Sequence, residues 1–230
     1  MHDVKGILGN HFMLRHLSPG ELDRLAQLVS TRHYEAGEKV FLKGDPGTAM
    51  MAVLSGRVRI CSYSAEGREV VLNVMSPGEV FGEIALIDGG ERTADAFSME
   101  PTELLILSRR DFLPFLAHNP EVCIRLLEVM CRRLRWTTQQ LEDLQFLDLR
   151  SRLAKRLLYL HDNHSEVSAA DKQRRVRISQ HLLANMIGTS REAVNKQLSE
   201  WRDQNLIKVG RGSIGVLDRR RLLEIVEQSL

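Results

Sequence analysis

The stretch from Pro120 to Leu147 limits what the rest of the chain can be. Apolar residues recur there at alternating spacings of three and four, the pattern of a coiled-coil seam, at Leu127, Met130, Leu134, Leu141 and Leu144. A helix over this stretch would be about 40 Å long, enough to connect two domains and to lie against a copy of itself. The sequence therefore predicts a parallel homodimer through residues 120–147.

One seam position in this stretch is polar. Thr137 stands where an apolar residue is expected, and Thr138 follows it. A hydroxyl that is buried in a seam needs a hydrogen-bond partner. Either the pair bonds back to the preceding turn, or it holds a polar group against the dimer axis, and the helix alone leaves both open. We expect the neighbouring Trp136 to pack against the N-terminal domain, with stacking near a ligand as the alternative.

Size and composition favour two domains of a soluble protein. The chain has 230 residues, of which 43% are apolar and 27% are charged. No run of eighteen apolar residues occurs and the first residues lack a signal-peptide core, so we expect a cytoplasmic protein with no membrane partner. Cys61, Cys123 and Cys131 lack the spacing of a disulfide framework, a zinc site or an iron–sulfur cluster, and we predict no metal.

Charge is divided unevenly along the chain. Residues 149–230 contain 16 Lys and Arg against 9 Asp and Glu, whereas the first 148 residues have an acidic excess. The C-terminal part is therefore predicted to meet an anionic surface.

The N-terminal part has a β pattern. A capping box at Ser18-Pro19-Gly20-Glu21 predicts a short helix, and alternating runs separated by glycines follow from about Thr31 to Ser108. Turns at this interval predict a small antiparallel β-sandwich or barrel.

One segment, Gly78 to Ala96, interrupts that pattern. Gly82 and Glu83 come between a strand end and a single helical turn, and Arg92 opens the next strand. A glycine at a helix start lets backbone N–H groups approach an anion, and arginine adds a bidentate partner for phosphate. Glu83 would repel phosphate but can accept a bond from a sugar hydroxyl. Taken singly, Glu83 could be a helix-dipole partner and Arg92 a solvated charge, but together they predict a ribose-phosphate site.

The sequence FGEIALIDGGERTADA (residues 81–96) resembles the phosphate-binding cassette of cyclic-nucleotide-binding domains. The whole chain, from about Leu17 to Leu217, resembles the CRP/FNR (catabolite activator) family of bacterial transcription regulators. The resemblance implies that Gly82 and Arg92 hold the phosphate and Glu83 the ribose 2′-hydroxyl. The complete ligand-binding set that we predict is Gly82, Glu83, Ile84, Ala85, Arg92, Thr93, Thr137 and Thr138.

The resemblance also bears on the identity of the ligand. Members that respond to cyclic AMP (cAMP) have a Thr-Ser pair where this chain has Thr137-Thr138, and there the pair meets the base from one subunit and then the other. Thr93 stands where those members usually have serine, and threonine at that cassette position goes with cyclic GMP (cGMP) in other domains. We therefore expect cAMP as the effector, with cGMP as the alternative.

The sequence of the C-terminal part predicts a winged-helix domain. Asp148 is a predicted N-cap for a helix over residues 150–161, a polar loop is expected over 162–175, and the boundary at 146–149 is the predicted hinge. Two helices capped by Ser179 and Ser190 and separated by Gly188 form a helix-turn-helix, with Val194, Leu198 and Trp201 on the buried face of the second. A hairpin over residues 207–217 completes the plan, in which the second helix enters the major groove.

Side chains suited to contacts with double-stranded DNA gather near these helix starts. Arg191 can bond guanine, and Glu192 can accept from cytosine. The predicted DNA-binding set is Ser179, Ser190, Arg191, Glu192, Asn195 and Lys196. The resemblance implies a palindromic promoter with TGTGA-like half-sites and RNA polymerase as a partner, and Lys196 replaces an arginine of the family.

The sequence thus predicts an α+β protein in three parts: an antiparallel β-barrel or jelly-roll cyclic-nucleotide-binding domain (1–119), a dimerisation helix and hinge (120–148), and a winged helix-turn-helix domain (149–230). We predict no catalytic residues, because no general base or metal cluster accompanies the phosphate site. A redox or gas sensor would need clustered cysteines or a haem ligand. A regulator that responds to cyclic di-GMP, or that needs no ligand, stays an alternative.

Overall fold

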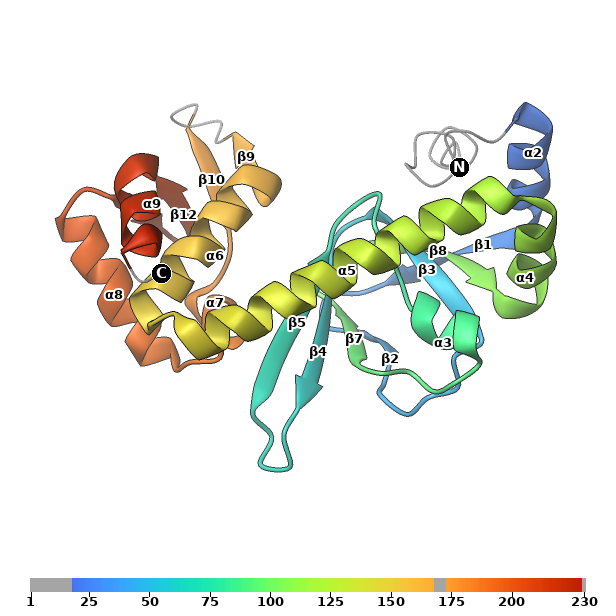
Figure 1. Ribbon diagram of the computed structural model, residues 1–230, viewed down its shortest axis with the longest axis horizontal. Coiled ribbons are helices and arrows are strands. Elements are labelled where there is room, and N and C mark those ends of the chain that lie inside the picture. The colour runs from blue at the N-terminus through green and yellow to red at the C-terminus, as the bar shows by residue number, and fades with distance from the viewer. Residues whose placement is uncertain (1–17, 168–172, 229–230) are drawn as a thin grey trace. The chain divides into compact units, whose positions relative to one another are not determined.

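The structure is a computed structural model, and it describes residues 18–167 and 173–228. The chain divides into two compact units, Met1–Arg133 and Leu134–Leu230 (Figure 1). The division falls inside one continuous helix, α5 (Pro120–Phe146). The two halves of α5 therefore belong to different units.

The first unit contains two four-stranded antiparallel sheets, with strand orders β1-β8-β3-β6 and β2-β7-β4-β5. Antiparallel pairing confirms the predicted β class. The strands are β1 (Val29–Tyr34), β2 (Lys39–Phe41), β3 (Ala49–Ser55), β4 (Val58–Tyr63), β5 (Glu69–Met75), β6 (Val80–Phe81), β7 (Asp95–Ser98) and β8 (Thr102–Ser108).

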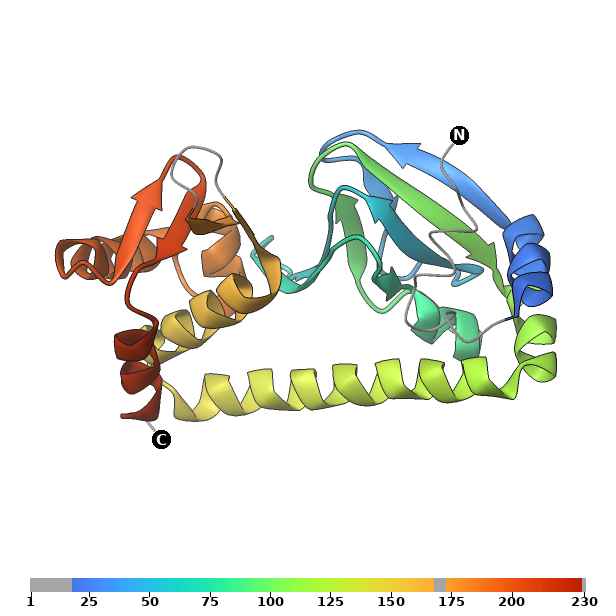
Figure 2. The same ribbon diagram turned by 90° about the horizontal axis from the view of Figure 1, so that it is seen from above.

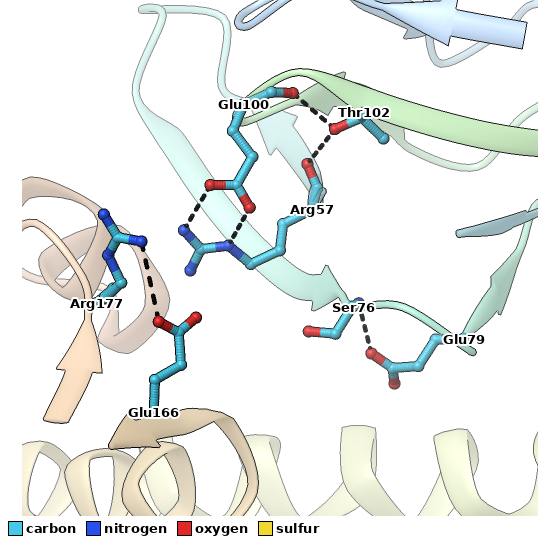
Figure 3. A network of polar contacts seen from close by, with 7 residues as sticks. All are labelled: Arg57, Ser76, Glu79, Glu100, Thr102, Glu166 and Arg177. Carbon is cyan, nitrogen blue, oxygen red and sulfur yellow. Dashed lines mark hydrogen bonds and ion pairs between the residues drawn. The ribbon is translucent and has the colours of Figure 1, made fainter. Parts of the chain in front are cut away.

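Polar contacts fix two turns of this unit (Figure 3). At the β3–β4 turn, the Arg57 guanidinium forks onto the Glu100 carboxylate, with Nε–Oε1 and Nη2–Oε2 distances of 2.9 and 3.2 Å. The Thr102 hydroxyl donates to the Glu100 carbonyl at 2.7 Å. Between β5 and β6, the Ser76 amide donates to Glu79 Oε2 at 2.7 Å. The second turn sets the entry of β6, which ends beside Gly82.

Helices cover one end of this unit. They are α2 (Pro19–Leu28), α3 (Glu83–Asp88), α4 (Arg109–His118) and the first half of α5. The predicted capping box of α2 is confirmed, since Ser18 and Glu21 bond each other's backbone amides. Figures 1 and 2 show α2 and α4 side by side, and their buried residues Leu25, Phe112 and Phe115 share a core with Val122, Leu126 and Val129 of α5. The sequence did not predict α4, because Pro114 lies inside it and proline normally ends or kinks a helix, although Ser108 caps its start.

The exposed stripe of α5 differs from the predicted seam at two positions, with Cys131 in place of Met130 and Thr138 in place of Thr137. Met130 packs partly buried against the core of the first unit, so its assignment to the seam is wrong. The exposed apolar residues Ile124, Leu127, Leu134 and Leu141 are 58, 63, 69 and 60% accessible, and exposed Cys131 and Thr138 continue their spacing of three and four. Helix α5 has apolar residues on two adjacent faces, one toward the core and one exposed. The spacing of these residues alone does not show to which face Met130 belongs.

The second unit is a helix-turn-helix with a four-stranded sheet of order β11-β12-β10-β9. Its elements are the second half of α5, α6 (Leu149–His164), β9 (Ser165–Val167), β10 (Arg174–Arg177), α7 (Gln180–Ile187), α8 (Arg191–Asp203), β11 (Ile207–Gly210), β12 (Ser213–Val216) and α9 (Arg219–Glu227). Buried Leu222 and Ile225 place α9 in the core, and the Ser151 hydroxyl of α6 donates to the Ile225 carbonyl at 3.1 Å.

The predicted polar loop over residues 162–175 is wrong at both ends. Helix α6 continues to His164, and β9 and β10 pair with each other in an antiparallel register. Residues 168–172 lie outside the described part of the chain. The composition of β10 does not indicate a strand, because Val176 is its one buried residue and arginines flank it.

The local predictions for the other helices are confirmed. Side-chain oxygens of Asp148, Ser179 and Ser190 accept from backbone amides three residues later, at 2.8, 3.1 and 3.2 Å. Gly188 ends α7 in the left-handed conformation, with φ of 68°. The buried residues of α8 are the predicted Val194, Leu198 and Trp201.

Candidate functional site

Gly82 forms a tight junction between β6 and α3. Its φ of 78° is left-handed, a conformation that glycine adopts without steric cost. A Cβ atom built there would lie 2.5 Å from Nη1 of Arg92. The junction therefore needs glycine for two reasons, its backbone conformation and the approach of the guanidinium.

Arg92 is a buried cation, with only 5% of its surface exposed. Its Nη1 donates to the Gly82 carbonyl at 2.8 Å, its Nη2 donates to the Ala49 carbonyl at 2.6 Å, and its Cζ lies 4.3 Å from the centre of the Phe41 ring. Desolvation lowers the pKa of this arginine, and the Asp45 and Glu83 carboxylates oppose that shift. Arg92 Nε is also buried but has no hydrogen-bond partner. The alternative of a solvated surface charge is therefore wrong.

Glu83 is buried more deeply, with 1% of its surface exposed. Its Oε1 forms an ion pair with Nη1 of Arg133 on α5, and Arg133 also donates to the Val80 carbonyl. Glu83 Oε2 is buried without a hydrogen-bond partner. If Glu83 served only as a partner of the helix dipole, it would need neither this burial nor this ion pair.

A cavity of about 80 Å³ joins these groups. It is lined by Phe41, Ile60, Met75, Phe81, Gly82, Glu83, Ile84, Ala85, Arg92, Thr93, Ala94 and Arg133. The structure thus brings together all six ligand-binding residues that were predicted in the cassette. Arg133 was missed, because spacing alone does not show that a basic residue fifty positions from Glu83 meets it.

Arg109 holds the other end of α3. Its Nε donates to the Leu86 carbonyl at 2.7 Å, where the last carbonyls of a helix lack intrahelical partners. A cation at this end also matches the helix dipole. The short helix behind Gly82 is therefore fixed at both ends by guanidinium groups.

The cavity does not include Thr137 or Thr138 among the described residues that line it. Both threonines are exposed on the part of α5 that belongs to the second unit. Trp136 beside them packs against Tyr159 of α6, with ring centroids 4.4 Å apart and ring planes tilted by 36°, so the prediction that it packs against the N-terminal domain is wrong. Nothing in the local sequence distinguishes an aromatic residue that turns toward α6 from one that turns toward the β-sheets.

Arg156 joins α5 to the helix-turn-helix. It is buried, its Cζ lies 4.9 Å from the centre of the Trp136 ring, and its Nη2 contacts Gln140 of α5 and the Met186 carbonyl of α7, the latter at 3.4 Å. A second link crosses the predicted hinge, where Lys155 Nζ lies 2.6 Å from Asp143 Oδ1. The turns of α5 that carry the two threonines are thus bonded to α6 and α7.

The exposed face of α8 carries the predicted base-reading side chains Arg191, Glu192, Asn195 and Lys196, opposite its buried face. Hydrogen bonds from its own backbone amide and from Ser190 lower the pKa of Glu192, which keeps this carboxylate ionised. Ser179 and Ser190 are exposed at the starts of α7 and α8. The face therefore offers both donors and an acceptor to base edges.

Comparison with known proteins covers both units. A model of the cyclic nucleotide-binding domain matches residues 31–119, and a model of the Crp-like helix-turn-helix domain matches residues 151–225. The cyclic AMP receptor protein of Thermus thermophilus is 36% identical, over 91% of this chain and 94% of its own length. The chain belongs to the CRP/FNR family of transcription regulators. It is therefore a DNA-binding regulator with a cyclic-nucleotide-binding domain.

Other CRP/FNR proteins are nearly as similar. A CRP-like cAMP-activated global transcriptional regulator of Mycobacterium tuberculosis is 31% identical, over 94% of this chain and 96% of its own length. A solved structure of CLP from Xanthomonas campestris, a regulator responsive to cyclic di-GMP, is 25% identical with a TM-score of 0.74 and covers 86% of this chain and 99% of its own. In the described ranges 18–167 and 173–228, no helix is long and apolar enough to cross a membrane, and no cluster of His, Cys, Asp and Glu could hold a metal ion.

Proposed function

We propose that this CRP/FNR regulator binds a cyclic mononucleotide, cAMP first and cGMP as the alternative. One observation carries the proposal: two buried polar atoms without protein partners, Arg92 Nε and Glu83 Oε2, belong to residues that line the same cavity beside Gly82. An unpartnered donor suits a phosphate oxygen, and an unpartnered carboxylate oxygen suits a ribose hydroxyl. Leaving either atom buried and unbonded costs about 1–3 kcal/mol, which a ligand would recover.

The names of relatives support the choice of base. The Thermus relative is called a cyclic AMP receptor protein, and the Mycobacterium relative is called cAMP-activated. Thr93 lines the cavity and would contact the phosphate. Thr137 and Thr138 would meet the base, with Thr138 contributed by the partner subunit.

Response to the ligand would require a homodimer through residues 120–147. The exposed stripe of Leu127, Leu134 and Leu141 supports this, because a row of leucines that are more than half exposed gains stability when a second helix covers it. The nucleotide would then favour one packing of the paired helices and so shift the population of a DNA-binding form.

The dimer would bind a palindromic promoter with TGTGA-like half-sites through Ser179, Ser190, Arg191, Glu192, Asn195 and Lys196. Two copies of α8 would lie in successive major grooves, about one helical turn apart. Once bound, the protein would act on RNA polymerase.

A second candidate effector is cyclic di-GMP. The Xanthomonas protein of similar fold is described as responsive to it, and its structure matches this chain with a TM-score of 0.74. The two ligands differ in their demand on the cavity, because cyclic di-GMP is one large ring with two phosphates and two bases, whereas a cyclic mononucleotide has one phosphate and one base.

Isothermal titration calorimetry with cAMP, cGMP and cyclic di-GMP tests the proposal. The Arg92→Leu variant is expected to lose mononucleotide binding, whereas Arg57→Leu, which removes an arginine paired with Glu100 at the β3–β4 turn, should keep it. Thermal unfolding of both variants checks that they fold. Affinity for cAMP and cGMP that is unchanged in Arg92→Leu would contradict the phosphate assignment, and binding of cyclic di-GMP alone would favour the second candidate.

A further inference from the structure

Arg156 of α6 is a buried cation that is not among the residues lining the cavity. Only 8% of its surface is exposed, and desolvation lowers its pKa, a shift that Tyr159 and Asp143 oppose. Its Nη2 donates to two neutral oxygens, the side-chain carbonyl of Gln140 and, at 3.4 Å, the backbone carbonyl of Met186. Among the residues that the structure describes, no carboxylate is hydrogen-bonded to this guanidinium.

A cation at this position is not the most stabilising choice. The removal of a charge from water is costly, and neutral carbonyl groups offset less of that cost than a carboxylate would. Apolar residues of similar volume often replace buried ionic groups without a loss of stability. What an arginine adds is directed hydrogen bonds, which fix the positions of the groups that it joins. The role of Arg156 therefore lies in the placement of its partners.

The partners of Arg156 lie on two other helices. On α5, Trp136 and Gln140 are four residues apart and so face the same side, and Arg156 Cζ lies 4.9 Å from the centre of the Trp136 ring. On α7, Met186 is in the last turn, where backbone carbonyls lack intrahelical partners and favour a nearby cation. One side chain of α6 thus holds a turn of α5 against the end of α7.

That turn of α5 carries the two predicted base contacts. Thr137 and Thr138 lie between Trp136 and Gln140 in the chain, and both threonines are exposed. Arg156 therefore fixes the inner side of a turn whose outer side would meet the nucleotide base.

The end of α7 leads directly to α8. Gly188 ends α7 with a left-handed φ of 68°, and Ser190 caps α8 two residues later. Leu144 of α5 also reaches this turn, since a Cβ atom built on Gly188 would lie 3.7 Å from Leu144 Cδ2. A displacement of α5 would therefore reach the α7–α8 turn by direct contact, without passing along the chain through the predicted hinge at 146–149.

We propose that Arg156 is a positioning residue for the response to the nucleotide: it couples the α5 turn at 136–140 to the α7–α8 turn and so sets the placement of α8. The inference rests on the proposed cyclic-nucleotide function. Arg156 is buried within the second unit and acts through Trp136, Gln140 and Met186. Its loss should leave nucleotide binding intact and remove the effect of the nucleotide on DNA affinity.

Fluorescence anisotropy of the full chain on DNA, with and without saturating cAMP, tests this inference. The duplex is one that the wild type selects from a randomised library in the presence of cAMP, so the assay assumes no site. The ratio of the two DNA affinities measures the coupling, which is typically about 5–150-fold in allosteric proteins. In Arg156→Met this ratio should fall below about threefold, while calorimetry should give a cAMP affinity within about threefold of the wild type.

Two further variants support this measurement. Arg156→Met leaves the Gln140 side chain without its donor, so Arg156→Met/Gln140→Leu replaces both bonded side chains by apolar ones and guards against a failure to fold. The double variant should show the same loss of coupling. Arg220→Met is the matched control, because it removes a cation of the same unit that pairs with Glu224 on α9, and it should keep the wild-type ratio.

A merely structural role of Arg156 would weaken DNA binding by the same factor with and without cAMP, and the ratio would stay at its wild-type value. An unchanged ratio in the two Arg156 variants would therefore overturn the proposal while the wild type still responds to cAMP. A wild type that binds no cAMP in calorimetry would instead contradict the proposed function, and the role of Arg156 would fail with it.

Discussion

Arg133 and Glu83 form an ion pair that joins α5 to the start of α3, with the carboxylate almost completely buried and the guanidinium about one-quarter exposed, at 28%. The pair lies at the cavity, and its partners are fifty positions apart in the chain. A ligand that bonds Glu83 would therefore contact a residue that is paired with α5, the helix that carries the exposed leucine stripe. This contact gives the first unit a direct link between the cavity and α5.

Removal of the arginine from that pair should be costly. Arg133→Met leaves a buried carboxylate without its cation, and we expect a loss of about 2–4 kcal/mol in the free energy of unfolding, measured by urea denaturation. Arg125→Met is the control, because Arg125 makes an i,i+3 pair with half-exposed Glu128 on the same helix and should cost less than about 1 kcal/mol. Equal losses of unfolding free energy in the two variants would show that the buried pair stabilises the protein no more than the exposed pair does.

Gly82 should tolerate no side chain. Gly82→Ala forces a strained left-handed φ and pushes Cβ against Arg92, so nucleotide affinity should fall at least about tenfold, together with a stability loss of about 1–3 kcal/mol. Gly67→Ala has nearly the same φ, 77°, but open space around its Cβ. Gly67→Ala should therefore lose stability but keep its nucleotide affinity. Equal affinities of the two variants in calorimetry would contradict the role of Gly82 at the cavity.

Cys131 offers a test of the dimer. It is exposed and continues the spacing of Leu127 and Leu134, whereas Cys61 is buried and its burial raises its thiol pKa to about 11. Seam positions in a parallel pair bring each residue close to its own copy, within reach of a disulfide. Mild oxidation should give a covalent dimer on a non-reducing gel for the wild type and for Cys123→Ser, but not for Cys131→Ser. A cross-link that persists in Cys131→Ser would refute this seam.

Glu192 should set base preference rather than affinity. An acidic side chain near phosphates is unfavourable unless it accepts a bond from a base, so Glu192→Ala should relax selection at one position of the half-site. Selection from a randomised duplex library followed by sequencing measures this. Arg202→Ala is the control, because Arg202 bonds neighbouring Asp203 at the far end of α8. Unchanged selectivity with uniformly weaker binding would show that Glu192 reads no base.

Sequence reasoning succeeded where the interacting groups are close in the chain. The caps at Ser18, Asp148, Ser179 and Ser190 join atoms three residues apart, so a local pattern predicts them. The cassette from Gly82 to Thr93 is also local, and its residues line one cavity.

Sequence reasoning failed where a partner far away in the chain determines which way a side chain points. Arg133 meets Glu83 across the fold, Trp136 turns to Tyr159, and Met130 joins the core of the first unit, and none of these partners can be read from helix periodicity. Strand β10 was missed for a related reason, since its pairing with β12 and not its arginine-rich composition makes it a strand.

The most direct test of the central claim, that the cavity holds a cyclic mononucleotide with its ribose hydroxyl on Glu83, is calorimetry with cAMP and 2′-deoxy-cAMP on wild type and Glu83→Ala. Loss of a hydrogen bond to a buried carboxylate costs about 1.5–3 kcal/mol, so wild type should bind the deoxy analogue at least about tenfold more weakly. Glu83→Ala should bind both nucleotides with the same, reduced affinity. Equal binding of the two nucleotides by wild type would contradict the account.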